Sequence, residues 1–339
     1  MKYLNVQYKK FESKRRYGVE LETDGKLKKS RVQSALKTLS HHDSYVTKYQ
    51  LSDGGNSWHV KDDATCGPQG RKGQKGVEVA SFVGQGIADL QHIAEVADGL
   101  QKIGCQVNKN CGLHIHAEAI DISPTQMGVI LAHWLKIEDI LTLILPFNRC
   151  ENEYCLPILS RCKWKSQIEE KKSSKWEPLD LWDLMIPQNI APYENEERRV
   201  NLNLVNYARA LHYSSNYRKT IELRWPEGTL SGHDIKCWVR LFLNFIDTCR
   251  DLPMPDNLER ATLEETLTIL GLNHSKESFL ILSEGLHETK TWFLERIIEN
   301  MTDFRLMIHG CPVLNYSKTA LNEAKNILNL MWEPVKKYT

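Results

Sequence analysis

Hydrophobic and polar residues alternate in several short segments of this chain, as they do in strands that have one buried face and one polar face. In the segment YGVELET, Val19 and Leu21 fall on one side of the backbone, and Glu20 and Glu22 fall on the other. Similar patterns predict strands at 17–23, 58–60, 76–81, 113–118, 200–207 and 219–225.

Apolar residues recur every three or four positions in the segments between and after these strands, which indicates helices. Helices are predicted within 26–50, at 87–104, at 123–145, at 231–246 and repeatedly from about 255 onward. The third of these begins with Ser123, Pro124 and Gln126, which fit an N-cap, a first helical position and a capping-box partner. Residues Ser231 to Asp234 fit the cap of the helix at 231–246. The stretch 146–197 has no clear period, and we expect it to be rich in loops.

Composition narrows the classes of function. The 339 residues carry 44 Lys and Arg against 43 Asp and Glu, so the net charge of +1 gives no bulk attraction to nucleic acid or to a membrane surface. The most apolar window, 127–147, is interrupted by His133, Lys136, Glu138 and Asp139 and is not expected to span a bilayer. The beginning of the chain lacks a secretory apolar segment, and nine cysteines suit free thiols, so we expect a cytoplasmic protein.

Ionisable side chains occupy alternate positions of several predicted strands, which places the members of each pair on one face. They are Glu20, Glu22, Glu78, His114, His116, Glu222 and Arg224. Any one pair is more often a solvated strand face or a surface ion pair. If a single sheet gathers all these faces, however, the carboxylates repel one another, and divalent metal ions are the usual remedy.

The sequences of these segments, and their order along the chain, resemble the motifs of the amidoligase family. This family is a divergent branch of the glutamine synthetase and glutamate-cysteine ligase superfamily. The resemblance runs from about residue 16 to about residue 250. It rests on GVELE at 18–22, WHV at 58–60 with Asp63 and Thr65, GVEVAS at 76–81, CGLHIH at 111–116 and TIELR at 220–224. Thr65 and Phe82 depart from the serine and proline of many relatives, but neither change removes a candidate ligand.

The resemblance implies an α+β fold, in which a glutamine-synthetase-like curved antiparallel sheet surrounds ATP and divalent metals and helices pack on its outer face. A catalytic domain would cover 1–255, with 146–197 as an insertion, and 256–339 would be a helical C-terminal extension. By similarity, the metal ligands would be Glu20, Glu22, Glu78, His114 and Glu222. Arg224 would contact the transferred phosphate, and His116 would lie beside the substrate. Arg199 and Asn203, in the stretch RRVNLN, would contact substrate or phosphate.

Three further residues have a functional and a plain interpretation. Asp63 could act as the base for an incoming amine, or it could simply form a turn beside Asp62. Lys72 and Lys75 lie in the basic, glycine-rich segment 66–76 and could reach a phosphate. This segment contains no phosphate-binding G-x-x-x-x-G-K-[ST] motif, so a flexible basic connection is the favoured interpretation.

The function expected from the sequence is an ATP-dependent carboxylate-amine ligase that uses Mg²⁺, or Mn²⁺, and forms an amide through an acyl phosphate. Its partners would be small-molecule or peptide carboxylates and amines. One alternative is a phosphotransferase of the guanidino-kinase type on the same fold, and a metal-dependent hydrolase is a weaker one. A non-catalytic metal-binding interaction protein is another alternative. The identity of the acid and the amine and the oligomeric state are left open.

Overall fold

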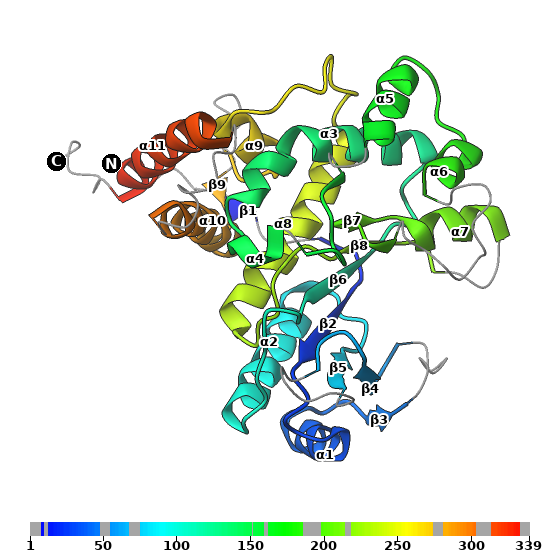
Figure 1. Cartoon of the computed structure of the whole chain (residues 1–339), viewed down its shortest axis with the longest axis vertical. Helices are drawn as coiled ribbons and strands as arrows, with labels where there is room; N and C mark the ends of the chain where they lie inside the picture. The colour runs from blue at the N-terminus through cyan, green and yellow to red at the C-terminus, as the bar shows by residue number, and fades with distance from the viewer. Residues whose placement is uncertain are drawn as a thin grey trace.

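The computed structural model describes the following residues: 8–9, 13–47, 55–67, 75–150, 152–158, 162–185, 198–213, 218–273, 281–302 and 313–332. A mixed sheet runs through the middle of the molecule (Figure 1). Within the described residues it has seven strands in the order β3-β4-β5-β2-β6-β8-β7. Their bounds are Ser44–Val46 (β3), Trp58–Asp63 (β4), Gly76–Ala80 (β5), Tyr17–Thr23 (β2), Leu113–Glu118 (β6), Thr220–Leu223 (β8) and Leu202–Asn203 (β7).

The sheet is mostly antiparallel. All pairings from β4 to β7 across the sheet are antiparallel, and the edge strand β3 pairs in parallel with β4. The strands predicted from alternation are confirmed at 17–23, 58–60, 76–80 and 113–118, and the predicted strand at 219–225 is present as Thr220–Leu223. The sheet was expected to be antiparallel throughout. This expectation is wrong only at the edge, where β3 pairs in parallel with β4.

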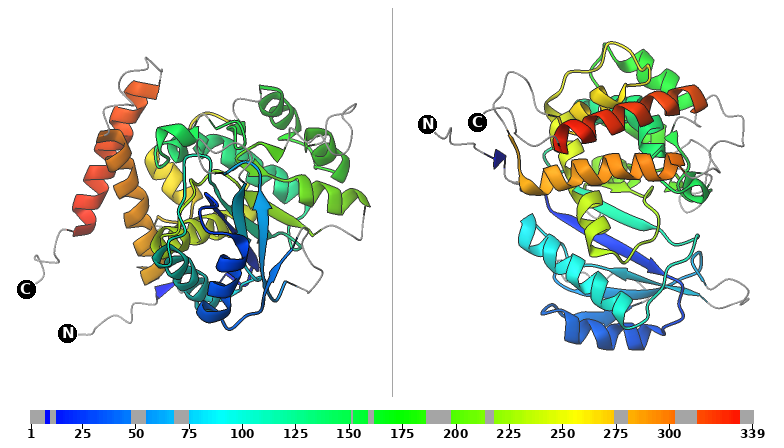
Figure 2. Two further views of the ribbon diagram at one scale, coloured as in Figure 1. Left: turned by 60° about the horizontal axis from the view of Figure 1, so that its bottom comes forward. Right: turned by 90° about the vertical axis from the view of Figure 1, so that its left-hand side faces the viewer.

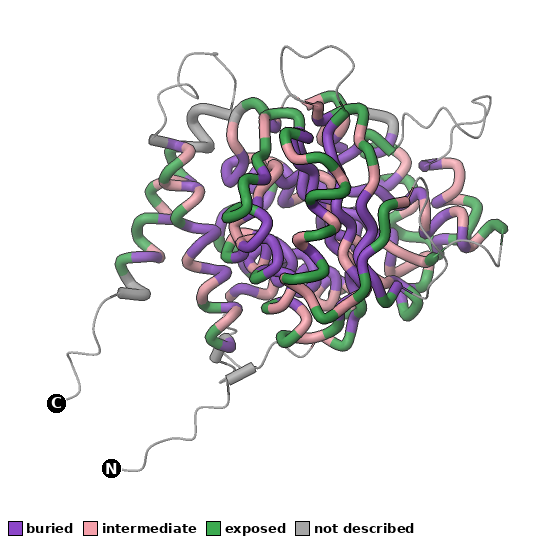
Figure 3. Tube along the Cα trace, turned by 90° about the horizontal axis from the view of Figure 1, so that it is seen from below, coloured by how far each residue is buried: buried purple, intermediate pink, exposed green. Residues whose placement is uncertain are grey.

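One face of the sheet is apolar and carries the core. Val19, Leu21, Ile115 and Leu223 point to this face and are buried. They share one hydrophobic cluster with residues of α2 (Gly86–Lys102) and α8 (Gly232–Asp251), and α8 packs against both α2 and β6. Helix α1 (Lys29–Leu39) packs against α2 and β4, and α3 (Pro124–Thr142) packs against α8. Buried positions are interspersed with exposed ones along α1 and α2, whereas α3 and α8 are buried over most of their length. Figure 3 shows the buried positions concentrated in the interior of the molecule.

The helix starts follow the sequence signals. At α3, the Ser123 side chain accepts a hydrogen bond from the Gln126 backbone, and the Gln126 side chain bonds back to complete the capping box. At α8, the side chain of Ser231 accepts from the backbone of Asp234. Both N-caps predicted from the sequence are thus confirmed.

The C-terminal part of the described chain is helical, as predicted. It contains α9 (Leu263–Ile269), α10 (Glu284–Thr302) and α11 (Val313–Trp332), together with a two-residue strand β9 (Ile281–Leu282) that pairs in parallel with β1 (Tyr8–Lys9). Helices α10 and α11 pack together at one side of the molecule (Figure 2). Trp292 of α10 meets Trp238 of α8 edge to face at 5.1 Å between ring centroids, which joins these helices to the rest of the protein.

Two expectations about secondary structure were wrong in detail. The stretch 146–197 is not mainly loop in its described part, since it contains α4 (Phe147–Cys150), α5 (Cys162–Lys171) and α6 (Pro178–Met185). These helices are too short to show a clear period. The helices predicted within 26–50 and at 123–145 are present, as Lys29–Leu39 and Pro124–Thr142.

The strand predicted at 200–207 is the second difference. Only Leu202–Asn203 is a strand, and helix α7 (Val205–Tyr213) begins directly after it. The reason is local, because the side-chain oxygen of Asn203 accepts a hydrogen bond from the backbone N–H of Val205 at 2.9 Å. An asparagine that satisfies a free N–H in this way favours a helix start over a continued strand.

Candidate active site

The face of the sheet opposite the core gathers the ionisable residues. Opposite residues in antiparallel strands point to the same side, so the register decides which of them meet. Glu20 lies opposite His114, Glu22 lies opposite Glu78, and His116 lies opposite Glu222. The polar positions that alternation placed on separate strands therefore share one surface.

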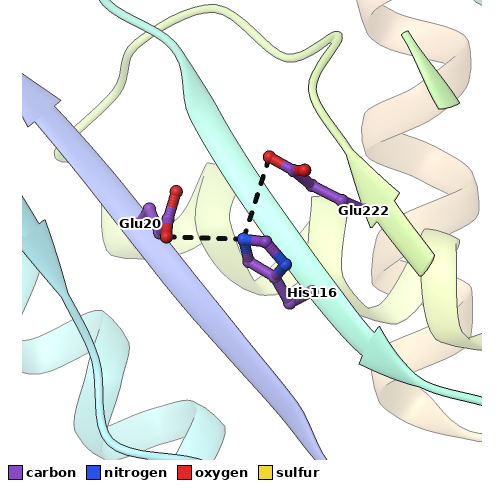
Figure 4. Close-up of side chains that lie close together, drawn as sticks. All are labelled: Glu20, His116 and Glu222. Atoms are coloured by element: carbon purple, nitrogen blue, oxygen red, sulfur yellow. Dashed lines mark ion pairs between the residues drawn. The ribbon is translucent and has the colours of Figure 1, made fainter. Parts of the chain in front are cut away.

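Three of these side chains form a close group across β2, β6 and β8. One ligand atom each from Glu20, His116 and Glu222 lies within 4.8 Å of the other two. Nε2 of His116 is 3.4 Å from Oε1 of Glu20 and 3.8 Å from Oε1 of Glu222 (Figure 4). The imidazole nitrogen thus faces two carboxylates from the neighbouring strands.

His114 and Glu22 lie beside this group. Nδ1 of His114 is 3.2 Å from Oε2 of Glu20, and its Nε2 is 3.6 Å from Oε1 of Glu22. The other carboxylate oxygen of Glu22 accepts a hydrogen bond of 2.6 Å from the backbone N–H of Gly112. His114 therefore links the two glutamates that alternate along β2.

A glycine is needed where CGLHIH enters the site. A Cβ atom on Gly112 would lie 2.5 Å from a guanidinium nitrogen of Arg149 and 3.0 Å from Nε2 of His114. Arg149 is buried and donates to the backbone carbonyls of Trp225 and Arg224 at 3.0 and 2.7 Å. The close approach of this guanidinium to the strand excludes any larger residue at position 112.

Glu222 is held in place from two sides. Asn203, on the edge strand β7, donates a hydrogen bond of 2.6 Å to Oε2 of Glu222, and the guanidinium of Arg224 pairs with Oε1. Nε of Arg224 is buried and has no hydrogen-bond partner among the described residues. Asn203, expected to bind a cofactor, thus lies where it orients Glu222, while Arg224 retains a donor for a ligand.

Glu78 meets a residue that the sequence reasoning did not include. The ammonium of Lys61 is 2.6 Å from Oε1 of Glu78 and 4.0 Å from Oε1 of Glu20. Lys61 lies directly opposite Glu78 in the pairing of β4 with β5. The period of two along β4, which places Lys61 on the same face as Asp63, was the signal that could have identified it.

Asp63 lies at the far end of the same face. Its Oδ1 accepts from the backbone N–H of Thr65 at 2.6 Å and from the Thr65 hydroxyl, so it forms the turn that the plain interpretation describes. The carboxylate also belongs to a second close group with Glu22 and Cys66. The structure therefore shows a turn residue at the margin of the candidate site, and its role as a base stays a prediction.

The remaining candidate residues lie farther out or outside the described chain. Arg199 is exposed, and its guanidinium lies 5.2 Å from the centre of the Tyr154 ring. Its neighbour Arg198 is the one whose charge interacts with Glu222. Lys75 is exposed, and Lys72 lies outside the described residues. A pair of adjacent arginines does not reveal from the sequence which one faces the site.

The charges of the close group are strongly coupled. Burial would raise the pKa of Glu222, but Arg224 and His116 outweigh it and lower this pKa to about 2. Burial would lower the pKa of His116, but the charges of Glu222 and Glu20 raise it to about 9. His116 is therefore protonated at neutral pH as long as no cation lies between the two carboxylates.

The pKa values of Glu22 and Glu78, which lie outside the close group, are shifted in the opposite direction to that of Glu222. Burial and the nearby Asp63 raise the pKa of Glu22 to about 8. Burial and the charge of Glu20 also raise the pKa of Glu78, whereas the ammonium of Lys61 acts in the opposite direction. The site thus holds more acidic groups than its own cations neutralise.

The close group fits a divalent metal ion. Nε2 of His116 is buried and has no well-directed hydrogen bond to any described residue, although two carboxylate oxygens face it. One imidazole nitrogen and two carboxylate oxygens are a donor set that suits Mg²⁺ and, because of the nitrogen, Mn²⁺. Glu20, His116 and Glu222 are therefore the residues that would hold such an ion.

Metal affinity should increase with pH. A ligating imidazole must lose its proton, and the pKa of His116 is about 9 in the metal-free protein, so each bound ion has to displace that proton below pH 9. We expect Mn²⁺ affinity to rise by about tenfold per pH unit between pH 7 and 9 and to level off above. Isothermal titration calorimetry in buffers of different ionisation enthalpy measures both the affinity and the protons released. An affinity that does not change over this range would contradict the assignment of His116.

A cavity of about 650 Å³ opens beside the close group. Glu20, His116 and Gly18 line it, and so do three cationic residues, Arg16, Arg218 and Lys219. A second hollow of about 860 Å³ shares Arg16, Glu118 and Ile120 with the first. The first cavity has the size of a small-molecule site and places cationic groups next to the carboxylates.

Comparison with known proteins identifies the class. Residues 13–246, more than half of the chain, match the family model described as "Putative amidoligase enzyme", and the chain belongs to this family. The resemblance of its motifs to the amidoligase family is thereby confirmed.

Other comparisons add little. No curated protein matches the chain. Among solved structures, it is similar to the complex between prokaryotic ubiquitin-like protein Pup and its ligase PafA, with 12% identity and a TM-score of 0.31. This match covers 94% of the chain and 64% of the other chain, so the protein spans less than two thirds of that ligase. Among the described residues, no helix combines the length and the apolar character needed to cross a membrane.

Proposed function

We propose that the protein is an ATP-dependent carboxylate-amine ligase whose reaction centre is the group formed by Glu20, His116 and Glu222. The observation that carries the proposal is the meeting of these three side chains beside Arg224 and a cavity with cationic residues. Family membership supports an amide-forming reaction at this centre.

A carboxylate does not condense with an amine in water, because its oxygen is a poor leaving group. In the proposed reaction, a carboxylate oxygen of the substrate attacks the γ-phosphorus of ATP, and ADP leaves. The amine nitrogen then attacks the acyl carbon, phosphate leaves, and the amine loses a proton. A bound Mg²⁺ or Mn²⁺ would supply charge neutralisation for the phosphates.

Residues of the chain have separate parts in this proposal. Arg224, with its unpartnered Nε, would offset the negative charge on the transferred phosphoryl group. Asn203 would hold Glu222 in position through its 2.6 Å hydrogen bond. Asp63 would accept the proton from the amine, and the cationic residues Arg218 and Lys219 would bind the phosphates of the nucleotide in the cavity.

The acid and the amine would be small molecules or parts of peptides. The two hollows that meet at Arg16 and Glu118 leave room for a substrate that extends beyond the reaction centre. We propose cytoplasmic conditions for the reaction, since they supply ATP and keep the cysteines reduced.

A direct assay tests this proposal. The protein is incubated with ATP, Mg²⁺ and pools of amino acids, peptides and amines, and both phosphate and condensed products are measured, the latter by mass spectrometry. A ligase releases phosphate only when an acid and an amine are both present, and it yields a product lighter by one water than their sum. A phosphotransferase would instead form ADP and a phosphorylated acceptor without free phosphate, and this result would reject the ligase proposal.

Replacing Arg224 by lysine should slow product formation by about 100-fold, because an ammonium cannot offer the planar, forked donors of a guanidinium to both Glu222 and phosphate. The rate is measured at saturating ATP, and the thermal midpoint is recorded beside it to check folding. Arg260, which pairs with Asp139 at the surface far from the site, provides the matched variant Arg260→Lys. Equal rates for Arg224→Lys and Arg260→Lys would show that Arg224 has no part in the chemistry.

A further inference from the structure

The ion pair between Lys61 and Glu78 changes the number of cations that the site can bind. The ammonium lies 2.6 Å from Oε1 of Glu78 and 4.0 Å from Oε1 of Glu20, on the side of Glu20 away from Glu222. The two glutamates belong to adjacent strands, and Lys61 reaches them from the third strand of the row. A fixed positive charge thus lies between two of the five side chains expected to hold metal.

The position of Lys61 follows from the backbone rather than from a chance rotamer. Lys61 and Glu78 are directly opposed in an antiparallel pair, and opposed residues project to the same face. The Lys61 side chain is only 29% exposed and that of Glu78 only 10%. Because the ammonium is mostly shielded from water, it remains paired with the carboxylates.

The close groups of metal-ligating atoms agree with this arrangement. Among the described residues, one such group contains Glu20, His116 and Glu222, and a second contains Glu22, Asp63 and Cys66. Glu78 belongs to neither of them. The second group combines a thiol with carboxylates, which is a poor set of donors for Mg²⁺ or Mn²⁺ because these ions prefer oxygen.

We propose that the ammonium of Lys61 occupies, at Glu78 and Glu20, the place that a second divalent cation would need, so that this chain binds a single divalent ion at Glu20, His116 and Glu222. The inference rests on the metal centre of the proposed function. It specifies that function further, because the charge of one of two possible ions is supplied by the protein itself. Lys61 would then neutralise Glu78 permanently, whatever the metal concentration.

Titration of the full chain with Mn²⁺ in the absence of nucleotide tests the proposal by calorimetry and by electron paramagnetic resonance of the free ion. The wild-type protein should bind one ion per chain. Lys61→Met removes the ammonium and should allow a second ion to bind, giving two per chain. Adding Glu78→Gln to Lys61→Met should return the number to one, because the second ion loses its ligand.

Two matched variants serve as controls. Lys29 pairs with Asp62, which lies on the opposite face of the same strand β4, at 2.8 Å. Lys29→Met removes a similar ion pair and should leave the number at one. Glu78→Gln in the wild-type background should leave the number at one, because Glu78 is not a ligand of the single ion, and this variant keeps the test decisive should Lys61→Met fold poorly.

Several outcomes would overturn the inference. They are two ions bound by the wild-type protein, one ion bound by folded Lys61→Met, or loss of Mn²⁺ binding in Glu78→Gln. The proposed function fails separately, since it depends on the condensed product in the assay with ATP. Amide formation with two bound ions would reject the role of Lys61 alone, and one bound ion without any product would reject the ligase proposal alone.

Discussion

Replacing Glu20 by glutamine is expected to weaken Mn²⁺ binding by more than about 100-fold and to abolish detectable product formation. Mutation of residues that only support metal ligands typically weakens binding by about 10- to 100-fold, and loss of a direct ligand should cost at least as much. Glu20 has partners on both neighbouring sides of the site, with His114, His116 and Lys61 all within 4.0 Å. Glutamine keeps the size of the side chain but removes its charge. The change therefore tests the charge rather than the packing.

Binding is measured by titration with Mn²⁺, and product formation by mass spectrometry. Glu170→Gln is the matched control, since Glu170 is an exposed residue of α5 and the substitution makes the same change in net charge. The control should bind Mn²⁺ and form product as the wild-type protein does. Retained turnover in Glu20→Gln would contradict both the metal centre and the proposed catalysis, and it would favour an interaction protein in which the site is not catalytic.

Replacing Asn201 by alanine is expected to lower the free energy of unfolding by about 3 kcal/mol, because it leaves buried polar groups without partners. Asn201 is fully buried, accepts a hydrogen bond of 3.1 Å from the indole of Trp134 and donates one of 2.6 Å to Glu138. The same oxygen of Glu138 also accepts from the backbone of Ile158 at 2.6 Å. The truncation removes an acceptor from one buried group and a donor from another.

Urea unfolding followed by circular dichroism measures this loss. Asn257→Ala is the matched control, because Asn257 is exposed and its side chain makes its hydrogen bonds near the surface. It should cost less than about 1 kcal/mol. A loss for Asn201→Ala no greater than that of Asn257→Ala would show that the buried network does not stabilise the fold.

The same network connects stability to the site. The backbone carbonyl of Asn201 accepts from the N–H of Arg224 at 2.8 Å, and Asn203 follows two residues later with its bond to Glu222. A weakened position 201 should therefore disturb the edge of the sheet that orients Glu222. We therefore expect a lower Mn²⁺ affinity in Asn201→Ala than in Asn257→Ala, which would show that Glu222 is less well positioned.

Much of the fold could be predicted from local pattern. Alternation along YGVELET and GLHIHAE identified two central strands and separated their polar faces from their apolar ones. The capping residues Ser123 and Ser231 marked the starts of α3 and α8. These features are local, since they depend on neighbours within about four residues along the chain.

Other features were beyond local pattern. The start of α7 depends on one hydrogen bond that the backbone N–H of Val205 donates to the side chain of Asn203. The short helices between 147 and 185 depend on burial of residues such as Trp164 and Leu181 in the core. In the site, the resemblance implied His114 as a metal ligand and His116 as a residue beside the substrate. The structure brings His116 into the close group with Glu20 and Glu222, and it turns His114 towards Glu20 and Glu22.

By itself, the sequence determined which side chains share a face of each strand, because alternation is a property of the extended backbone. It thereby determined that Glu20, Glu22, His114, His116, Glu222 and Arg224 are available to a common surface. Only the tertiary structure decided the order and register of the strands, and with them the pairing of Lys61 with Glu78 and of Asn203 with Glu222. The physical reason is that Coulomb and hydrogen-bond energies depend on distances of a few ångströms. Residues far apart in the chain come that close only once the sheet has formed.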